Sequence, residues 1–467
     1  MAPVSRHGKP LPPGSPDRRR KRAGQPDKSV TKVWHEKNWS GFAQDLRSRL
    51  NLTFDPEEWQ ARTILSILAG KDVIFAAGTG YGKSLVFEGL ASQRPRKTVV
   101  VICPLKALEN DQVAAAEAKG LRAAAINEST EDKEAAWEQL EKGAYRLVYI
   151  SPEMALSPRF RSLCTNQQFR NKLSALIVDE AHCIEQWGDE FRPAYKELDR
   201  LRCYSGTSIP FVACSGTMTT GAFETVWNSL DFGHRRFWGV DVGCHRPELT
   251  YVIQKLTNED DPALDLLDLV PELKNLTKDS KPEDIPKILM YFSTQSGTKQ
   301  ASLSLRASLP EHLRSCVFPF NALLSEDAKK DAWLRFSEGK IRILCSTDAA
   351  GMGCNALDVK YVVVVGQKLK SLSVLVQRWG RAARGRGLTG KCWLLMPEWA
   401  FEREPQPQAV TRLIEDALGK SGTKKKKKKA EKKETKEALA QRAALQYPLL
   451  NLINAKSELR SMVGLVI

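Results

Sequence analysis

The sequence predicts an α/β fold in which parallel β-strands alternate with α-helices. Three observations carry this prediction. A glycine-rich loop, Ala76 to Ser84, lies between a strand-like run (DVIFAA) and a helix-like run. Apolar runs rich in β-branched residues then recur with helical runs between them, which is typical of sheets that are buried on both faces. About a hundred residues after the loop, another apolar run ends in the acids Asp179 and Glu180.

Length and composition indicate a globular chain of two to four domains. It has 467 residues, of which 42% are hydrophobic, so each domain can bury a core of its own. We find no apolar run of membrane-spanning length and no secretory leader, so we expect an intracellular protein without a membrane partner. The ten cysteines are scattered without a CxxC pair, which predicts neither a disulfide framework nor a zinc cluster.

The net charge of +16 belongs mostly to two segments. Residues 1–33 carry +7 and residues 420–437 carry +7, which leaves +2 for the rest of the chain. The first segment has six prolines and three glycines, so we expect a disordered basic tail. Its cluster Arg18 to Arg22 fits a nuclear address, a phosphate-binding arm or a solvated charge run. The expected location is the nucleus, or the cytoplasm of a prokaryote.

Two helices are expected before the glycine-rich loop. Apolar residues recur at helical spacing over residues 39–50. A second helix is predicted within residues 52–68, with Asp55 as its N-cap and Pro56 at its first position. Gln60 lies on this helix about twenty residues before the loop, where an amide can pair with the edge of an adenine base. The alternative is a surface glutamine.

The loop itself has the composition of a phosphate-binding loop. Its glycines allow positive φ and a close approach of backbone N–H groups to an anion. Lys83 is expected to reach the β- and γ-phosphates of ATP, and Ser84 to ligate Mg²⁺. A glycine-rich β-turn with an incidental Lys-Ser pair is the alternative. The residues expected to contact the nucleotide here are Ala77, Gly78, Thr79, Gly80, Tyr81, Gly82, Lys83 and Ser84.

The acid pair completes the expected nucleotide site. At the end of the run ALIVDEAH, Asp179 can hold Mg²⁺ through water and Glu180 can take a proton from the attacking water. An acidic helix cap at a strand end is the alternative reading. The position of the pair, about a hundred residues after a phosphate loop and across alternating strands and helices, favours the catalytic one.

The run HCIEQWGDEFRPAYKEL, His182 to Leu198, resembles the aromatic-rich loop of the RecQ family of DNA helicases, HCxSQWGxxFRPxYxxL. Glu185 stands where that family usually has Ser. The resemblance implies that Trp187, Phe191 and Arg192 sense single-stranded DNA, since aromatic faces stack on bases without sequence preference. A buried aromatic cluster is the alternative.

The resemblance extends through most of the chain. FVACSGTMT resembles the family's coupling motif, which assigns that role to Ser215 and Thr217. CHRPELTYVI resembles the RPNLxY segment that enters the second domain. IRILCSTDAAGMGCN resembles ATxAFGMGIN, which implies nucleotide contacts by Asp348 and Gly351. QRWGRAARGRG resembles QExGRAGRDG. Its Gln377, Arg381 and Arg384 are expected on one helix face, directed into a cleft between the two domains and opposite the phosphate loop.

The sequence also departs from the family. Where the family usually has FRxxQ before the phosphate loop, this chain has PEEWQ, so the arginine of that motif is absent. Where the family has HAGL, this chain has FNAL, Phe320 to Leu323. After residue 400 we expect neither the four-cysteine zinc subdomain nor the winged helix, and therefore no zinc. An acidic insert over residues 258–284 is expected to be surface loop and helix. The apolar end SMVGLVI suggests a packed helix or an incomplete gene product.

These features together predict two tandem RecA-like domains, with ATP and Mg²⁺ between them. The expected division is a basic tail over 1–33, a first domain with its helical lead-in over 34–240, a second domain over 245–400 and a helical, Lys-rich tail over 401–467. The expected catalytic residues are Lys83, Glu180, Gln377, Arg381 and Arg384. Expected partners are single-stranded and partially duplex DNA, bound by a monomer. Three functions stay open: a 3′–5′ DNA helicase, a DNA-stimulated translocase that does not separate strands, and a non-enzymatic DNA-binding module.

Overall fold

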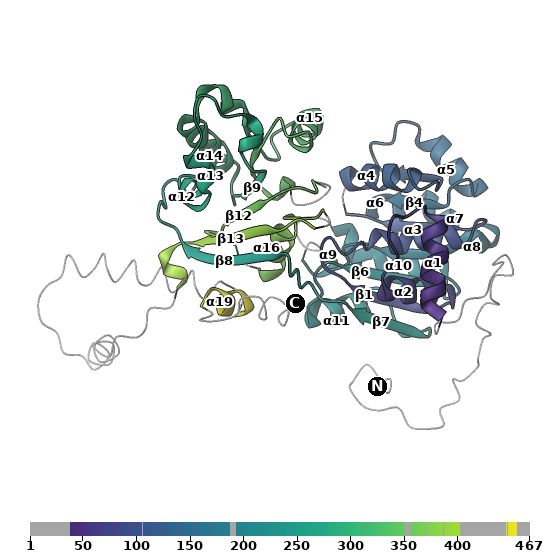
Figure 1. Cartoon of the computed structure of the whole chain (residues 1–467). Helices are drawn as coiled ribbons and strands as arrows, with labels where there is room; N and C mark the ends of the chain where they lie inside the picture. The colour runs from purple at the N-terminus through teal and green to yellow at the C-terminus, as the bar shows by residue number, and fades with distance from the viewer. Residues whose placement is uncertain are drawn as a thin grey trace, which may run out of the picture.

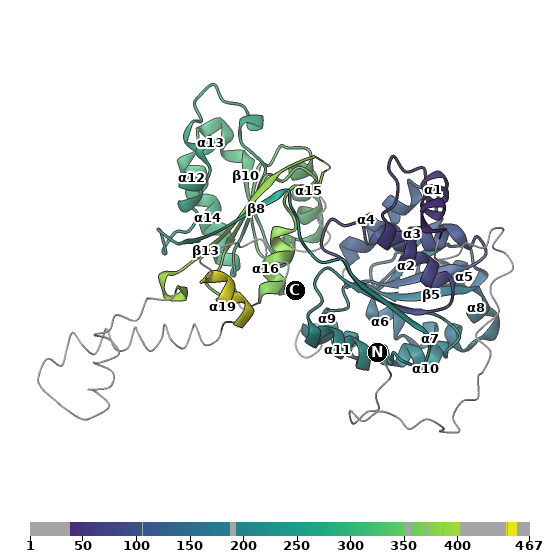
Figure 2. The same cartoon turned by 60° about the horizontal axis from the view of Figure 1, so that its bottom comes forward.

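The computed structural model describes residues 38–104, 106–186, 193–350, 356–369, 371–385, 387–401, 445 and 447–454. Within these residues the chain forms two α/β units that lie side by side (Figures 1 and 2). Each unit is built on one parallel sheet with helices on both faces, which confirms the predicted fold class.

The first sheet has seven strands in the order β3-β4-β2-β5-β6-β1-β7, and every pairing is parallel. Its central strands are buried along their whole length, because their β-branched and aromatic side chains are covered on both faces. The strands are β1 (Asp72–Ala76), β2 (Thr98–Ile102), β3 (Ala123–Ile126), β4 (Leu147–Ile150), β5 (Leu173–Val178), β6 (Phe211–Ser215) and β7 (Phe237–Asp241).

The helices of the first unit divide between the two faces of its sheet. One face is covered by α1 (Trp39–Arg49), α2 (Glu58–Leu68), α3 (Ser84–Gln93) and α4 (Lys106–Glu117). The other face is covered by α5 (Lys133–Lys142), α6 (Pro152–Ala155), α7 (Pro158–Thr165), α8 (Gln167–Lys172), α9 (Cys183–Gln186), the 3₁₀ helix η2 (Pro193–Asp199), α10 (Arg200–Ser205) and α11 (Thr220–Ser229).

The second sheet has six strands in the order β10-β11-β9-β12-β13-β8, again all parallel. They are β8 (Leu249–Lys255), β9 (Ile288–Tyr291), β10 (Val317–Phe320), β11 (Ile343–Ser346), β12 (Tyr361–Val365) and β13 (Gly390–Met396). One face carries α12 (Asp265–Leu269), α13 (Pro271–Lys274) and α14 (Gln295–Ser308). The other carries α15 (Glu326–Ser337), α16 (Leu372–Trp379) and α19 (Tyr447–Ile453). The 3₁₀ helices are η3 (Pro282–Asp284), η4 (Glu311–Cys316), η5 (Asp348–Ala350) and η6 (Glu398–Ala400).

Helix α2 begins later than the sequence predicts. Its N-cap is Glu57 rather than Asp55, and Pro56 precedes the helix. The Glu57 N–H donates to Gln60 Oε1 at 2.9 Å, within a capping box that ties the first turn. This bond satisfies the backbone donor of Glu57 at the start of the helix.

Two segments of the second unit are more buried than expected. The insert over residues 258–284 does contain helices, but Leu266, Val270 and Leu273 belong to the core beside β9. Helix α19 packs Leu449 and Leu452 into the opposite core, although it lies in the stretch predicted to be a tail. Figures 1 and 2 show this helix in yellow beside β8 and α16. The end SMVGLVI and residues 410–418 lie outside the described residues.

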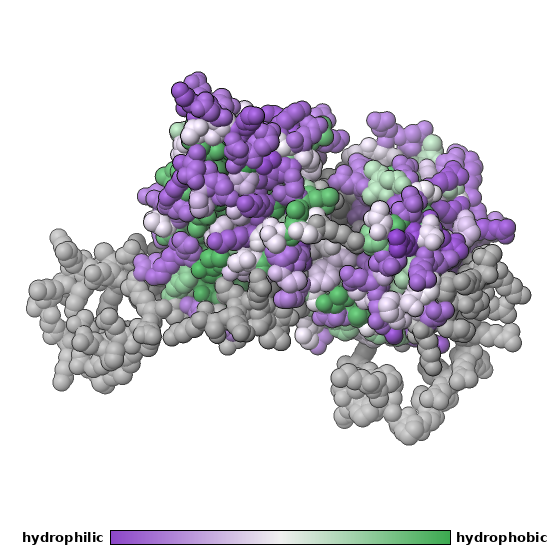
Figure 3. Space-filling model, in the orientation of Figure 1, coloured by the Kyte–Doolittle hydropathy of each residue, from purple (hydrophilic) through white to green (hydrophobic). Residues whose placement is uncertain are grey.

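The view in Figure 3 shows a largely hydrophilic surface on both units, with apolar side chains in small groups. Among the residues that the structure describes, no helix combines the length and the apolar character needed to cross a membrane.

A buried ion cluster anchors the start of β1. Asp72 is fully buried and accepts hydrogen bonds from Arg202 Nη2 at 2.8 Å and from the Phe211 N–H at 2.9 Å. Arg235 Nε lies 3.4 Å from the same carboxylate. Asp72→Ala would leave two guanidinium groups without their counter-charge, so we expect a loss of about 3–5 kcal/mol in the free energy of unfolding.

The matched control for this change is Asp55→Ala. Asp55 pairs with Arg47 at 3.3 Å, but both side chains are about half exposed, so we expect a loss of at most about 1 kcal/mol. Urea denaturation of the parent and both variants, followed by tryptophan fluorescence, measures the difference. Equal losses in the two variants would contradict the anchoring role of Asp72.

Candidate nucleotide-binding site

The glycine-rich loop joins β1 to α3 at the carboxyl edge of the first sheet. Gly80 and Gly82 have φ of 91° and 79°, values that a residue with a Cβ rarely adopts. Lys83 Nζ donates to the Ala77 carbonyl at 3.1 Å, which draws its side chain back over the loop. A Cβ on Gly216, just after β6, would come within 3.4 Å of Lys83 Nζ. The end of β6 therefore lies beside the Lys83 side chain and the loop.

Asp179 and Glu180 follow β5, which pairs with β6 next to β1, so the acids face the loop. Burial and the neighbouring charge of Glu180 raise the pKa of Asp179 to about 6. Burial opposes ionisation of Glu180 as well, but Lys83, His182 and Arg381 lower its pKa below the usual value. Glu180 is therefore ionised at neutral pH, and its φ of 47° is a strained conformation that aims its side chain.

The residues around Ser84 and Asp179 fit a divalent cation. The Ser84 hydroxyl accepts a hydrogen bond from Gln112 Nε2 at 2.9 Å, which orients its oxygen at the start of α3. Asp179 and Glu180 bring two carboxyl groups together in a poorly hydrated site, and a cation would relieve the repulsion that raises the pKa of Asp179. Glu180 Oε2 accepts no hydrogen bond from the described residues. Hydroxyl and carboxylate oxygens are the ligands that Mg²⁺ prefers.

His182 connects the acids to Ser215, in the predicted coupling motif, and to the second unit. Gln377 Nε2 donates to His182 Nε2 at 3.0 Å, so the proton of the neutral imidazole is on Nδ1. His182 Nδ1 lies 2.8 Å from Ser215 Oγ, and the Ser215 hydroxyl donates to the Thr217 carbonyl at 2.6 Å. Burial lowers the pKa of His182, Lys83 lowers it further and Glu180 opposes them, which keeps the ring neutral. Gln377 Nε2 is also 3.4 Å from Thr217 Oγ1.

The structure thus brings together Ser215, Thr217 and Gln377, three residues that the sequence nominated separately. The sequence alone assigns no role to His182. The available signal was its position two residues after Glu180, without a cysteine or histidine partner at metal-ligand spacing.

The arginines of the second unit do not lie on one helix face. Helix α16 ends at Trp379, before Arg381 and Arg384, so the predicted spacing along a helix is wrong there. Gly380 begins a turn, and a Cβ at this residue would come within 2.8 Å of Thr79 Cβ in the phosphate loop. Ala383 then adopts a φ of 45°, which no helix continues. Gly380 itself still donates to the Val376 carbonyl, and it packs against the other unit where a side chain would not fit.

The two arginines have different surroundings. Arg381 lies near enough to Glu180 for its positive charge to contribute, after Lys83 and His182, to lowering the pKa of that carboxylate. Arg384 Nε donates to the Gly380 carbonyl at 3.1 Å, within its own loop. Asp348 accepts from Arg378 Nε at 2.9 Å and from Arg378 Nη2 at 2.8 Å, so its carboxylate already has a partner inside the second unit.

Gln60 is held by the protein at both ends of its amide. Its Nε2 donates to the carbonyls of Tyr81 and Gly82, at 3.1 and 3.2 Å, and its oxygen caps α2. Gln60 therefore supports the phosphate loop, and its pairing with adenine remains a prediction. Burial, followed by the nearby Cys244 and Glu248, raises the pKa of Tyr81, so its phenol is protonated at neutral pH.

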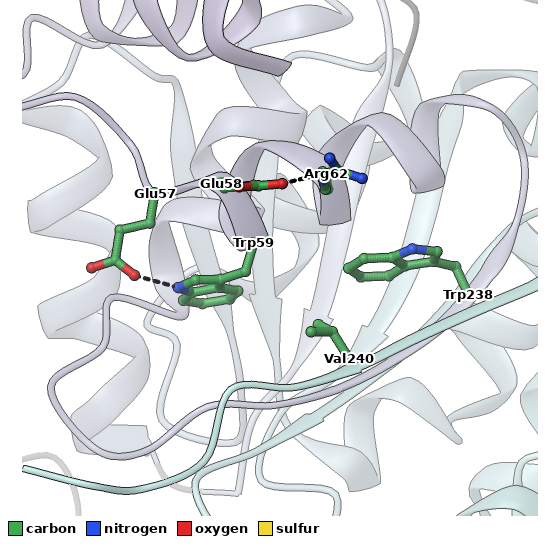
Figure 4. A pocket seen from close by; sticks show the side chains of 6 residues that line it. All are labelled: Glu57, Glu58, Trp59, Arg62, Trp238 and Val240. Atoms are coloured by element: carbon green, nitrogen blue, oxygen red, sulfur yellow. Dashed lines mark hydrogen bonds and ion pairs between the residues drawn. The ribbon is translucent and has the colours of Figure 1, made fainter. Parts of the chain in front are cut away.

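Glu57 stands at the position where the resembled family has arginine. Its carboxylate accepts a hydrogen bond from Trp59 Nε1 at 2.7 Å. A pocket of about 480 Å³ opens beside this pair, between α2 and β7, and Figure 4 shows Trp238 on its far side. The pocket is lined by Glu57, Glu58, Trp59, Arg62, Trp238 and Val240. Its lining residues Glu57, Glu58 and Trp59 immediately precede Gln60 in the sequence, but no residue of the phosphate loop lines the pocket.

Some predicted residues lie outside the described ones. They are Trp187, Phe191 and Arg192 of the aromatic-rich loop and Gly351 of the second unit. No group of three or more metal-ligating side chains is found among the described residues.

Comparisons with known proteins agree with this geometry. Residues 57–225 match the DEAD/DEAH box helicase family, and residues 268–386 match the helicase conserved C-terminal domain. The chain is 28% identical over 372 residues to ATP-dependent DNA helicase Q-like 2 of Arabidopsis thaliana, covering 78% of this chain and 50% of that protein. It is 29% identical over 350 residues to the probable ATP-dependent DNA helicase RecS of Bacillus subtilis, covering 74% and 65%.

The fold has solved counterparts as well. The structure of S. cerevisiae Dbp5 bound to RNA and ADP BeF3 superposes with a TM-score of 0.59 at 14% identity, covering 85% of this chain and 97% of that one. The chain spans about half the length of the first curated relatives it matches. With a phosphate loop, an acid pair and a second-unit glutamine in one site, the chain contains a DEAD/DEAH box helicase domain and a helicase conserved C-terminal domain, and it is similar to RecQ-type DNA helicases.

Proposed function

We propose that the chain is an ATP-dependent 3′–5′ DNA helicase that couples ATP hydrolysis to movement along single-stranded DNA and to duplex unwinding. The observation that carries this proposal is the composite site: Gln377 of the second unit donates to His182 and Thr217 of the first. A site assembled from two units changes whenever they move, which is what a motor requires. DNA as the substrate is supported by the curated relatives, which are named as DNA helicases.

Different residues of the first unit have different roles in the proposed hydrolysis of ATP. The phosphate loop binds the triphosphate through its N–H groups, and Lys83 offsets the charge of the β- and γ-phosphates. Ser84 and Asp179 would hold Mg²⁺, which would neutralise charge on the phosphate oxygens. Glu180 is ionised and retains 23% side-chain exposure, so it can orient a water and accept its proton.

The second unit supplies further residues to the site and is joined to the acid pair by hydrogen bonds. Arg381 and Arg384 offset charge that spreads over the γ-phosphoryl oxygens during transfer. The hydrogen bonds from Gln377 through His182 to Ser215 join the acids to the loop after β6. The segment with Trp187, Phe191 and Arg192 directly follows α9 in the sequence, five residues or more after His182. We propose that single-stranded DNA bound there acts on the nucleotide site through His182.

Three measurements on the purified chain test the proposal: ATP hydrolysis alone, ATP hydrolysis with single-stranded DNA, and strand displacement from tailed duplexes. We expect single strands to stimulate hydrolysis, because the aromatic loop and the acids share one short segment. We expect displacement from a duplex with a 3′ single-stranded tail and much less from the matched duplex with a 5′ tail. Glu180→Gln, which keeps the shape of the side chain but removes its charge and its ability to accept a proton, serves as the inactive control.

Each other outcome selects an alternative. Stimulated hydrolysis without strand displacement from either duplex indicates a translocase that does not unwind. DNA binding without hydrolysis indicates a binding module that retains the helicase fold. Displacement from the 5′-tailed duplex alone would contradict the proposed polarity.

A further inference from the structure

The segment between the two units crosses directly over the phosphate loop. It runs from the end of β7 at Asp241 to the start of β8 at Leu249. The Val242 N–H donates to the Ala76 carbonyl at 2.8 Å, and the Gly78 N–H donates to the Gly243 carbonyl at 3.0 Å. A Cβ on Gly78 would come within 2.9 Å of Cys244 Cα, so the two backbones touch. The connection between units is therefore packed against the nucleotide site along its length.

One side chain of this segment, Arg246, contacts both units at once. It is 7% exposed, and its Nη1 donates to the Thr79 carbonyl of the phosphate loop at 3.1 Å. Its Nη2 donates to the Ala382 and Ala383 carbonyls of the second unit at 3.1 and 2.8 Å. Its Nε donates to Glu248, which supplies the counter-charge. All three guanidinium nitrogens are thus used.

The carbonyls that Arg246 binds in the second unit belong to the loop that carries Arg381 and Arg384, the two arginines proposed to offset charge on the γ-phosphate. Ala382 and Ala383 lie between Arg381 and Arg384, and Ala383 holds the left-handed conformation that turns this loop. A backbone in that conformation is unstable without supporting contacts. The bonds from Arg246 stabilise it and fix its distance from Thr79.

We propose that Arg246 is a positioning residue that sets the loop with Arg381 against the phosphate loop when the two units close. It contacts neither nucleotide nor water in this role and acts through Arg381. Because the guanidinium must reach Thr79 and two carbonyls of the other unit together, only a planar fork with several donors serves. The inference rests on the proposed ATP hydrolysis for its kinetic test and on the interdomain geometry for its second test.

The kinetic test compares Arg246→Ala with the parent in steady-state ATP hydrolysis. We expect kcat to fall at least about tenfold, a typical size for coupling between two sites, while KM for ATP changes less than about threefold. The KM is spared because Lys83 and the loop N–H groups that bind the phosphates remain. Arg246→Lys should restore little, since one ammonium cannot span three carbonyls.

A double-mutant cycle separates positioning from general support. If Arg246 acts through Arg381, then Arg246→Ala should cost kcat little more in an Arg381→Ala background. Independent, multiplicative losses would overturn the proposal. The matched control is Arg306→Ala, because Arg306 also donates from Nε and Nη2 to a backbone carbonyl, that of Val317, but entirely within the second unit. Its kcat should equal that of the parent.

A second test does not depend on hydrolysis. Small-angle X-ray scattering of the parent with a non-hydrolysable ATP analogue should give a smaller radius of gyration than Arg246→Ala or Arg246→Lys with the same analogue. Equal radii in all three proteins would overturn the proposal even if the parent hydrolyses ATP. A parent that compacts but does not hydrolyse would leave Arg246 in its role and reject the proposed function alone. If Arg246→Ala fails to fold, Arg246→Lys carries both tests.

Discussion

Lys83→Ala is expected to lower ATP turnover by at least about 10³-fold, the upper range for removing one preorganised charge stabiliser. Lys83 lies over the phosphate loop, with its Nζ 3.1 Å from the Ala77 carbonyl and beside Gly216. Its positive charge also lowers the pKa values of Asp179 and Glu180. The substitution therefore removes a phosphate ligand and makes the catalytic acids harder to ionise. Steady-state release of phosphate measures the loss.

Two comparisons show whether the loss is specific. Lys142→Ala removes an exposed lysine that pairs with Glu138 one helical turn away, and it should hydrolyse ATP at the parental rate. Glu180→Gln should bind nucleotide with parental affinity and lose hydrolysis, because it keeps the loop and Lys83 but cannot accept a proton. Turnover by Lys83→Ala within about threefold of the parent would remove the phosphate loop from the mechanism.

Arg381→Ala is expected to lower ATP turnover at least about a hundredfold with little change in nucleotide affinity, because arginine fingers act on the transition state. In the structure Arg381 is near enough to Glu180 to shift its pKa, whereas Arg384 bonds to the Gly380 carbonyl of its own loop. Arg384→Ala should also be impaired, since both residues sit on the turn that faces the phosphate loop. Single-turnover hydrolysis together with nucleotide titration separates the chemical step from binding.

Charge alone should not restore this activity. Arg381→Lys places a point charge where a planar fork is needed, so we expect no more than a few per cent of parental turnover. Arg335→Ala is the matched control, because Arg335 lies on α15 of the same unit and pairs with Asp331 at the surface. Parental rates in both Arg381→Ala and Arg384→Ala would mean that the second unit does not complete the site, and the two-unit motor would be wrong.

The features that the sequence predicted correctly are those that depend on short, continuous stretches of residues. Glycines at Gly80 and Gly82 are needed for positive φ wherever the loop lies, so the loop was recognisable between its strand and its helix. The apolar runs of β1, β2 and β5 are buried on both faces, and this burial can be predicted from their composition without knowing which strands pair with them. Asp179 and Glu180 follow such a run directly, so their place at the sheet edge was determined as well.

Other features depend on contacts between distant residues. Helix α16 stops at Trp379, and the next residue, Gly380, packs on Thr79, three hundred residues away. The helical spacing of the sequence does not predict that contact. Helix α19 is buried only because the second sheet offers it an apolar face.

By itself, then, the sequence determined the α/β fold, the phosphate loop and the acid pair, because local backbone requirements and burial select those residues. The tertiary structure decided where α2 begins and α16 ends, how His182 joins Ser215 to Gln377, and that Arg246 holds both units. These arrangements depend on which side chains meet across the two units, and periodicity along the chain does not contain that information.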